Sequence, residues 1–258
     1  MRIHIIGGGN LGMALALGIT QFTSHQVQVS RRNVSKIEHF ANEKLHVSND
    51  NAYRIDEADM VLLTIKPHQI AHVVSELAAQ APNALWVSAV SGWSLSQLQE
   101  LTPSHYKWMR VMPNIAAQFG ESATCISYSG AFLTEMHSVV ELFNALGTAV
   151  VIDEKLMDAA TVLGACGTAY ALRYIRASMQ AGIEIGFDAQ TALAIASQTA
   201  KGAARMALEE KIHPEQLIDR VTTPQGCTIV GLNEMEHQGF SSALIQGIKT
   251  SLNKIKHP

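Results

Sequence analysis

The feature that most constrains this fold is a glycine-rich turn between an apolar run and a helical stretch. The run Ile3–Ile6 predicts a buried strand, and Asn10–Ile19 predicts a helix that begins directly after the turn. Gly7, Gly9 and Gly12 fit the pattern G-x-G-x-x-G, whose glycines permit a tight turn, let backbone approach a pyrophosphate and pack helix against strand. The stretch therefore predicts a dinucleotide at a helix N-terminus, and the alternative is a glycine-rich turn without a ligand.

The composition is that of an ordinary globular protein that acts on small molecules. Its 258 residues are 47% hydrophobic and 16% charged, enough for one large domain or two modest ones with a real core. A net charge of -3 without a dense Lys/Arg cluster gives no electrostatic reason to expect nucleic acid or an anionic membrane. With no secretion signal and no apolar run of about 18 residues, we expect a cytoplasmic protein that does not enter a membrane.

No metal site is expected from the cysteines and histidines. Cys125, Cys166 and Cys227 are an odd number without paired metal spacing, so neither a disulfide framework nor structural zinc is indicated. The histidines are scattered along the chain. His68 and His72 could share a helix face, but they lack the H-E-x-x-H pattern of a zinc site.

Residues 1–152 alternate strand-like runs with helical stretches, as in a parallel sheet with crossover helices. Helical periodicity occurs over Pro67–Ala79 and Phe132–Gly147. Further strands are expected at Gln26–Ser30, Ala58–Pro67, Ala84–Gly92, Tyr106–Asn114, Ser122–Ser127 and Thr148–Asp153. The predicted fold class is therefore α/β, with a Rossmann-type dinucleotide-binding domain over residues 1–152.

Residues 153–258 show almost no strand signal and predict an all-helical domain. Ala160–Gly186 and Ala189–Glu210 are rich in small residues and apolar around much of their circumference, which is typical of helices buried on several sides. A domain of this size has little capacity to bury such helices alone. We therefore expect a homodimer, or a higher homo-oligomer, formed through this half, and the alternative is a self-contained bundle on a monomer.

The end of the second strand favours NADP(H) over NAD(H). An NAD site usually has Asp or Glu there to bind the ribose hydroxyls, whereas this chain has Ser30, Arg31, Arg32 and Asn33. Arginine carries a fixed charge and binds phosphate in a bidentate way, so this sequence suits a ribose phosphate. The alternative interpretation is a solvated basic turn before the next helix.

Several separated segments together resemble the pyrroline-5-carboxylate reductases, the enzymes that make proline. Five segments carry the resemblance in order and cover nearly the whole chain: Ile5–Ile19, Ile65–Ile70, Val87–Gly92, Arg110–Ser122 and Asp219–Phe240. Two stretches depart from the family. Gly164–Tyr170 stands where the family usually has Ser-Gly-Ser-Gly-Pro-Ala-Tyr, and Pro224–Thr228 reads Pro-Gln-Gly-Cys-Thr where the family has Pro-Gly-Gly-Thr-Thr.

The resemblance implies NADPH-dependent reduction of the cyclic imine 1-pyrroline-5-carboxylate to L-proline. By position in the family motif, Thr228 is the candidate catalytic residue, with its hydroxyl placed to bond the ring nitrogen. The other candidate substrate-binding residues are Thr222, Thr223, Gly226 and Cys227. A helix beginning after Pro224 would offer its free N–H groups to the substrate carboxylate, although Thr222–Pro224 also fits an ordinary helix cap.

The candidate cofactor residues come from the glycine loop, the second strand and the resemblance. Those implied by the resemblance alone, such as Asn51, Lys66 and Asn114, could instead cap or line the edge of the domain. The full set is Gly7, Gly9, Asn10, Leu11, Gly12, Ser30, Arg31, Arg32, Asn51, Ile65, Lys66, Pro67, Ala89 and Asn114.

Other functions remain open at this point. The departures near the substrate leave room for a reductase of a cyclic imine with a different ring size. They also leave room for an inactive dinucleotide-binding regulator on the same fold. A beta-hydroxyacid dehydrogenase is disfavoured, because it needs a lysine on the first long helix of the second half and residues 159–185 contain none.

Overall fold

The computed structural model describes residues 1–129 and 133–256, which form two compact units. We call Met1–Cys166 the first unit and Gly167–Lys254 the helical unit, and describe each by itself. In the described residues the last strand ends at Val151, one residue before the domain boundary predicted at residue 152. The first unit nevertheless continues to Cys166, because the residues after the strand pack on the sheet.

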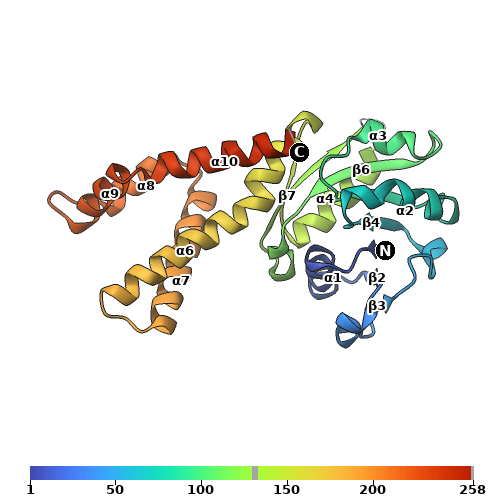
Figure 1. The fold of residues 1–258 in the computed structure, drawn as a ribbon, viewed down its shortest axis with the longest axis horizontal. Coiled ribbons are helices and arrows are strands. Elements are labelled where there is room, and N and C mark those ends of the chain that lie inside the picture. Colours follow the sequence, from blue (N-terminus) through green and yellow to red (C-terminus); the bar gives the residue numbers. More distant parts are fainter. Residues whose placement is uncertain (130–132, 257–258) are drawn as a thin grey trace. The chain divides into compact units, whose positions relative to one another are not determined.

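The first unit is built on one eight-stranded sheet, whose order in the described residues is β3-β2-β1-β4-β5-β6-β7-β8 (Figure 1). The central order 3-2-1-4-5-6 is that of a Rossmann fold, so the predicted α/β class is confirmed. The strands are β1 Arg2–Ile6, β2 Gln26–Ser30, β3 Leu45–Ser48, β4 Met60–Leu63, β5 Leu85–Ser88, β6 Lys107–Met112, β7 Ser122–Tyr128 and β8 Gly147–Val151.

Helices cover both faces of this sheet because its strands are apolar on both sides. The α-helices are α1 Asn10–Phe22, α2 Ile70–Leu77, α3 Leu95–Glu100, α4 Leu133–Ala145 and α5 Met157–Ala160. Single 3-10 turns lie at Val34–Lys36, Glu38–Phe40, Ile55–Glu57, Pro67–Gln69, Ala78–Gln80, Ile115–Phe119 and Glu154–Leu156. The helix expected at Phe132–Gly147 is α4, and Phe132 itself lies outside the described residues.

Each face of the sheet has its own apolar core. Alternation along β1 directs Ile3 and Ile5 into the core that contains residues of α1 and α4, and directs Ile6 into the core with α2 and α3. In the second core, Trp86 and Trp108 are paired across neighbouring strands with their ring centroids 5.4 Å apart. Both cores therefore hold the carboxyl ends of the central strands in fixed places.

Two parts of the sheet differ from the sequence prediction. The sheet is not wholly parallel, since β7 runs antiparallel to β6. Only the short segment between Met112 and Ser122 joins these strands, and a parallel crossover needs a dozen or more residues. Strand β3 was not predicted, because its four residues Leu45–Ser48 alternate too briefly to give a signal.

The predicted helix over Ala160–Gly186 is interrupted. A π-helix spans Thr161–Cys166, and regular α6 begins only at Gly167. The apolar pattern alone could not show this, because a π-helical turn has almost the same sequence signature as an α-helical one.

The helical unit contains α6 Gly167–Glu184, α7 Ala189–Glu210, α8 Pro214–Val221, α9 Cys227–His237 and most of α10 Phe240–Lys256 (Figure 1). Helices α6 and α7 pack closely where Gly182 meets Ala192, since a Cβ on Gly182 would lie 2.9 Å from the Ala192 Cβ. In the described part of the chain, α6 has no buried residue and α7 has only Ala192 and Ala196. The expected all-helical second half is confirmed, and much of its apolar surface is uncovered within one chain.

Candidate functional site

A cavity of about 890 Å³ lies at the carboxyl ends of the strands β1 to β5. This edge is where ligands bind in open parallel sheets. Most of the candidate cofactor residues line the cavity: Gly7, Gly9, Asn10, Leu11, Ser30, Arg31, Arg32, Asn51, Ile65, Lys66, Pro67 and Ala89. Residues from the ends of five strands, β1 to β5, are therefore brought to one site.

The glycine loop forms the floor of the cavity. Gly7 has φ +113°, and a Cβ there would lie 2.9 Å from the Thr64 carbonyl oxygen. Gly12 packs α1 against the loop, since a Cβ on it would lie 2.1 Å from the Gly7 oxygen. A Cβ on Gly9 would meet no atom within 4 Å, so this position faces open space. The three glycines thus match the roles predicted for turn, close approach and packing.

The start of α1 is suited to an anion. Gly9 occupies the N-cap position without a side-chain cap, and the first turn of α1 contains no acidic residue. The first N–H groups of a helix have no intrahelical acceptor and lie at the positive end of its dipole. A pyrophosphate therefore fits here, and the residues present match a dinucleotide.

At the end of β2, Ser30 and the two arginines have different surroundings. The Ser30 hydroxyl oxygen is buried and has no hydrogen-bond partner among the described residues. The Arg31 Nη1 donates to the Gly8 carbonyl oxygen at 2.7 Å, which ties this half-buried side chain to the glycine loop. Arg32 is exposed at the same cavity. The site therefore has cationic groups where an NAD site would have a carboxylate.

The cavity lining also includes residues that the sequence did not indicate. Helix α2 follows Pro67, and the exposed side chains of His72 and Glu76 on it form an ion pair at 3.3 Å when the histidine is protonated. The spacing of three and four residues along α2 was the available signal, because such positions share a helix face. The missed lining residues are Gly8, Thr64, Gln69, His72, Val73, Glu76, Val90 and Ser91.

Asn114 is a candidate that the structure does not place among the residues lining the cavity. It follows β6 and is 9% exposed. Its Oδ1 accepts from the Ala116 backbone N–H at 2.9 Å, and its Nδ2 donates to the Gly164 carbonyl oxygen at 3.2 Å. The side-chain amide therefore contacts protein atoms on both sides.

The candidate substrate loop lies in the helical unit, between α8 and α9. Thr222 is the C-cap of α8, and its hydroxyl donates to the Asp219 carbonyl oxygen at 3.1 Å. Helix α9 begins at Cys227 with Gly226 as its N-cap, not directly after Pro224. The interpretation of Thr222–Pro224 as the cap of this helix is therefore wrong, because Gln225 and Gly226 come between them and the helix.

The start of α9 is open to an anion. Its first turn has no acidic residue, and none of the described side chains caps it. Gly226 donates its N–H to the Thr223 carbonyl oxygen at 2.9 Å, and a Cβ on Gly226 would lie 2.5 Å from the Thr223 hydroxyl. Cys227 is exposed and Thr228 is half-buried. A carboxylate can be bound here by backbone N–H groups without Lys or Arg.

The described residues show neither a metal site nor a membrane-spanning helix. Among residues 1–129 and 133–256, no group of three or more His, Cys, Asp or Glu side chains is arranged to hold a metal. The cysteines in this range are free thiols, and burial raises the pKa of Cys125. None of the described helices is long and apolar enough to cross a membrane.

The glycine loop, the cavity at the strand ends and the following helices define a Rossmann-type oxidoreductase that binds a nicotinamide dinucleotide. A family model named NADP oxidoreductase, coenzyme F420-dependent, matches residues 2–92, and one named pyrroline-5-carboxylate reductase dimerisation matches residues 154–257. The chain belongs to the pyrroline-5-carboxylate reductase family.

Relatives of nearly full length support this assignment. Pyrroline-5-carboxylate reductase 2 of Dictyostelium discoideum is 38% identical over 98% of this chain and 91% of its own length. Reductase 1 of that organism is 40% identical over 98% of this chain, which spans only 49% of that relative. The structure of a Plasmodium falciparum pyrroline carboxylate reductase with NADP bound has a TM-score of 0.88 and 25% identity, over 100% of this chain and 97% of that one. The family predicted from five sequence segments is confirmed.

Proposed function

We propose that this chain reduces 1-pyrroline-5-carboxylate to L-proline and uses NADPH in preference to NADH. The observation that carries the proposal is the near-full-length match to a reductase of this name, 38% identical over 98% of the chain. The geometry of the glycine loop and of α9 supports it, because one site suits a dinucleotide and the other a carboxylate. The preference for NADPH is supported by Arg31 and Arg32 at the cavity, and by the NADP bound to the Plasmodium relative.

The cofactor is held by the cavity residues that the sequence analysis named. The N-terminus of α1 would hold the pyrophosphate through the backbone after Gly9, and the exposed Arg32 would hold the ribose phosphate. Asn51, the segment Ile65–Pro67 and Ala89 line the rest of the cavity and would hold the remainder of the dinucleotide. When bound, the nicotinamide supplies the hydride that adds to the imine carbon.

Backbone and side-chain groups at the start of α9 bind and orient the substrate. The free backbone N–H groups of Cys227 and Thr228 at the start of α9 bind the substrate carboxylate, with Gly226, Thr222 and Thr223 beside them. The Thr228 hydroxyl bonds the ring nitrogen, orients the ring and helps deliver the proton that the nitrogen takes up as the imine becomes an amine. Hydride and proton together complete the reduction.

We also propose that the chain forms a homodimer through its helical half, with higher homo-oligomers possible on the same contact. The dimerisation model covers residues 154–257, and large apolar side chains are exposed along the helices there. On the helices they include Leu172, Ile183, Leu193, Ile195, Leu208 and Ile245, and Phe187 lies between α6 and α7. Surface of this kind is stabilised by a second copy, because a monomer rarely exposes so large an apolar area.

Thr228→Ala tests the catalytic part of the proposal. We expect turnover at saturating pyrroline-5-carboxylate to fall about tenfold to a hundredfold, or about 1.4 to 2.7 kcal/mol of barrier, with NADPH affinity nearly unchanged. Thr228→Ser keeps the hydroxyl and recovers much of the loss. Thr250→Ala, which removes an exposed threonine of α10, is the control that leaves turnover unchanged.

Three results would contradict parts of this proposal. If the Ala and Ser variants of Thr228 behave alike, or only their thermal stability changes, the threonine packs or caps the helix and does not act on the substrate. If the wild-type enzyme oxidises NADPH only with a six-membered cyclic imine carboxylate, the departures at Gln225 and Cys227 have changed the substrate. If it oxidises none, the chain is a dinucleotide-binding protein without this activity.

A further inference from the structure

Asn114 joins the end of β6 to the π-helix of Thr161–Cys166, and both belong to the first unit. The contact is the hydrogen bond from the Asn114 Nδ2 to the Gly164 carbonyl oxygen, at 3.2 Å. The two residues are 50 positions apart in the chain, so only the fold brings them together. The bond connects the ligand-bearing edge of the sheet with the segment where the sequence departs from its family.

Asn114 is itself held firmly in place. Its backbone N–H donates to the Ser122 hydroxyl at 3.0 Å, and that hydroxyl is 3.1 Å from the Thr124 hydroxyl. Its Oδ1 accepts from the Ala116 N–H, as the N-cap of the turn that follows. A side chain bonded on both faces and 9% exposed has one orientation, so its Nδ2 is a fixed donor.

The segment that receives this bond is unusual in its backbone. A π-helix is rare, and such turns occur often at functional sites because they displace the backbone from regular helical positions. Here it follows α5, and the Thr161 hydroxyl donates to the Met157 carbonyl oxygen at 2.8 Å. The regular α-helix is the competing conformation of this segment. A buried side-chain donor that bonds one of the segment's carbonyls stabilises the π-helix against it.

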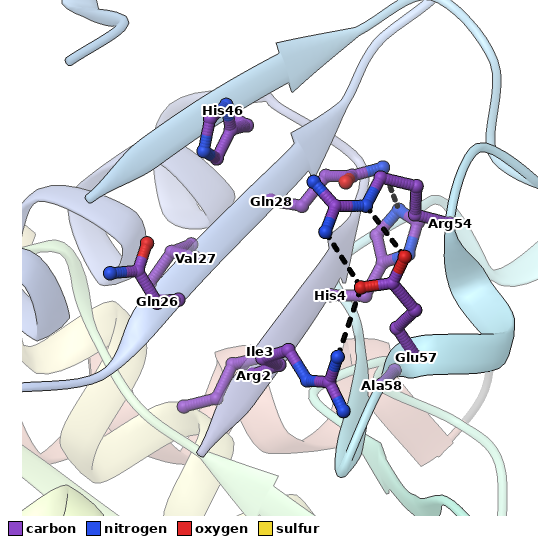
Figure 2. Close-up of a pocket in the computed structure, with 10 residues that line it drawn as sticks. All are labelled: Arg2, Ile3, His4, Gln26, Val27, Gln28, His46, Arg54, Glu57 and Ala58. Carbon is purple, nitrogen blue, oxygen red and sulfur yellow. Dashed lines mark hydrogen bonds and ion pairs between the residues drawn. The ribbon is translucent and has the colours of Figure 1, made fainter. Parts of the chain in front are cut away.

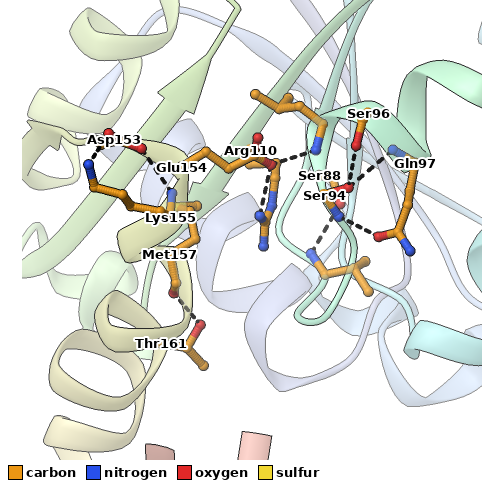
Figure 3. Close-up of polar contacts among 12 residues, drawn as sticks. Ser88, Ser94, Ser96, Gln97, Arg110, Asp153, Glu154, Lys155, Met157 and Thr161 are labelled. Carbon is orange, nitrogen blue, oxygen red and sulfur yellow. Dashed lines mark hydrogen bonds and ion pairs between the residues drawn. The ribbon is translucent and has the colours of Figure 1, made fainter. Parts of the chain in front are cut away.

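The residues that precede this π-helix are also attached to the sheet (Figure 3). Buried Arg110 on β6 donates from Nη1 to the Glu154 Oε1 at 3.0 Å, and the Leu95 N–H donates to the same oxygen at 2.5 Å. Residues Glu154–Cys166 are therefore attached to the sheet at both ends, by Arg110 near the start and by Asn114 near the end. The position of Gly164–Cys166 depends on the second attachment.

We infer that Asn114 is a positioning residue for the reductase reaction, and that it acts by holding the π-helix of Thr161–Cys166 through Gly164. This inference rests on the proposed function. Asn114 lies outside the residues that line the cavity, and both ends of its amide bond protein atoms, so we assign it a role in holding the backbone. Its loss displaces the Gly164–Cys166 backbone, which impairs reaction of the imine and leaves dinucleotide binding intact.

Asn114→Asp is the sharpest test. The aspartate keeps an oxygen for the Ala116 N–H but replaces the donor to Gly164 by a second oxygen, which repels the carbonyl. Asn42→Asp is the matched control, because Asn42 also accepts backbone N–H groups through its Oδ1, from Lys44 at 2.9 Å and Leu45 at 3.1 Å, and does not line the cavity. Each variant is measured for kcat and KM with pyrroline-5-carboxylate, for NADPH Kd, and for amide hydrogen exchange over residues 157–166.

We expect Asn114→Asp to lower kcat/KM for the imine about tenfold or more, to leave NADPH Kd within about twofold, and to speed exchange in residues 157–166. Asn42→Asp changes none of these. The inference is overturned if kcat/KM stays within about twofold, if NADPH affinity falls in parallel with it, or if exchange is unchanged. A wild-type enzyme without reductase activity refutes the proposed function and with it the role in the reaction, whereas unchanged exchange in an active enzyme refutes the inference alone.

Discussion

His4 makes the first unit sensitive to acid. It lies on β1, 2% exposed, on the sheet face opposite α1 beside a small cavity (Figure 2). Burial lowers its pKa from 6.5 to about 4, and the charge of Asp50 opposes this shift only partly. The His4 Nδ1 has no partner among the described residues, and Nε2 is 3.4 Å from the Gln28 Nε2. Protonation therefore places a charge where the structure provides no acceptor.

The pKa values determine the size and sign of the effect. The folded state binds the proton more weakly than the unfolded state, so stability is at its full value above pH 6.5 and is lost as pH falls towards 4. A shift of about 2.5 units corresponds to about 3 kcal/mol once both states are protonated. At pH 5 the linkage relation gives a loss of about 2 kcal/mol. That is a large part of the stability of a typical domain.

His4→Gln removes the titrating group and provides the measurement. Urea unfolding at pH 7 and pH 5 is followed by tryptophan fluorescence, since Trp86, Trp93 and Trp108 all lie in the first unit. Other titrating groups act equally in both proteins, so the wild type should lose about 2 kcal/mol more than the variant between these pH values. His46→Gln, which removes an exposed histidine beside the same cavity, should keep the wild-type loss. Equal losses in wild type and His4→Gln would refute the reasoning.

Three further predictions concern the cofactor cavity and the loop between α8 and α9. Arg32→Ala should raise the Kd for NADPH far more than the Kd for NADH, as measured by fluorescence titration. Arg31→Ala should weaken the binding of both cofactors, because its bond to the glycine loop is lost. Equal effects of both variants on both cofactors would contradict this prediction. Gly12→Ala should lower the free energy of unfolding by about 1 to 3 kcal/mol and weaken NADPH binding, because its Cβ would lie 2.1 Å from a backbone oxygen. Gly9→Ala should weaken NADPH binding without lowering the free energy of unfolding, because its Cβ would meet no atom within 4 Å. Gln225→Gly should stabilise the chain by up to about 1 kcal/mol in thermal unfolding, because Gln225 has φ 60° and glycine adopts such a φ without strain. Gln225→Ala keeps the strained backbone and should not stabilise the chain.

Sequence patterns that act over a few residues predicted the strands and helices of both units well. Strand β2 and helix α7 have the predicted bounds, and the other predicted strands are displaced by a few residues at most. Apolar alternation and glycine conformation act within a few residues, so they can be interpreted without the fold. The same holds for the glycine loop, whose residues supply both the turn and the helix N-terminus.

The sequence did not predict the direction of β7 or the backbone conformations that depend on packing against other parts of the chain. The reversal at β7 follows from the length of a connection, and the π-helix at Thr161–Cys166 follows from packing on the sheet. Helix α9 begins at Cys227 and not after Pro224, because the residues between form a turn with Gln225 at positive φ. Each of these outcomes depends on which alternative backbone the surroundings stabilise.

The sequence by itself determined the Rossmann-type class, the glycine loop, the cationic end of β2 and the family, because each is encoded within one segment or in the order of several. Only the tertiary structure decided that Arg31 bonds Gly8, that α2 supplies a wall of the cavity, and that Asn114 bonds Gly164. These contacts join residues between 23 and 50 positions apart in the chain. Hydrogen bonds act over about 3 Å, so their partners are known only once the chain has folded.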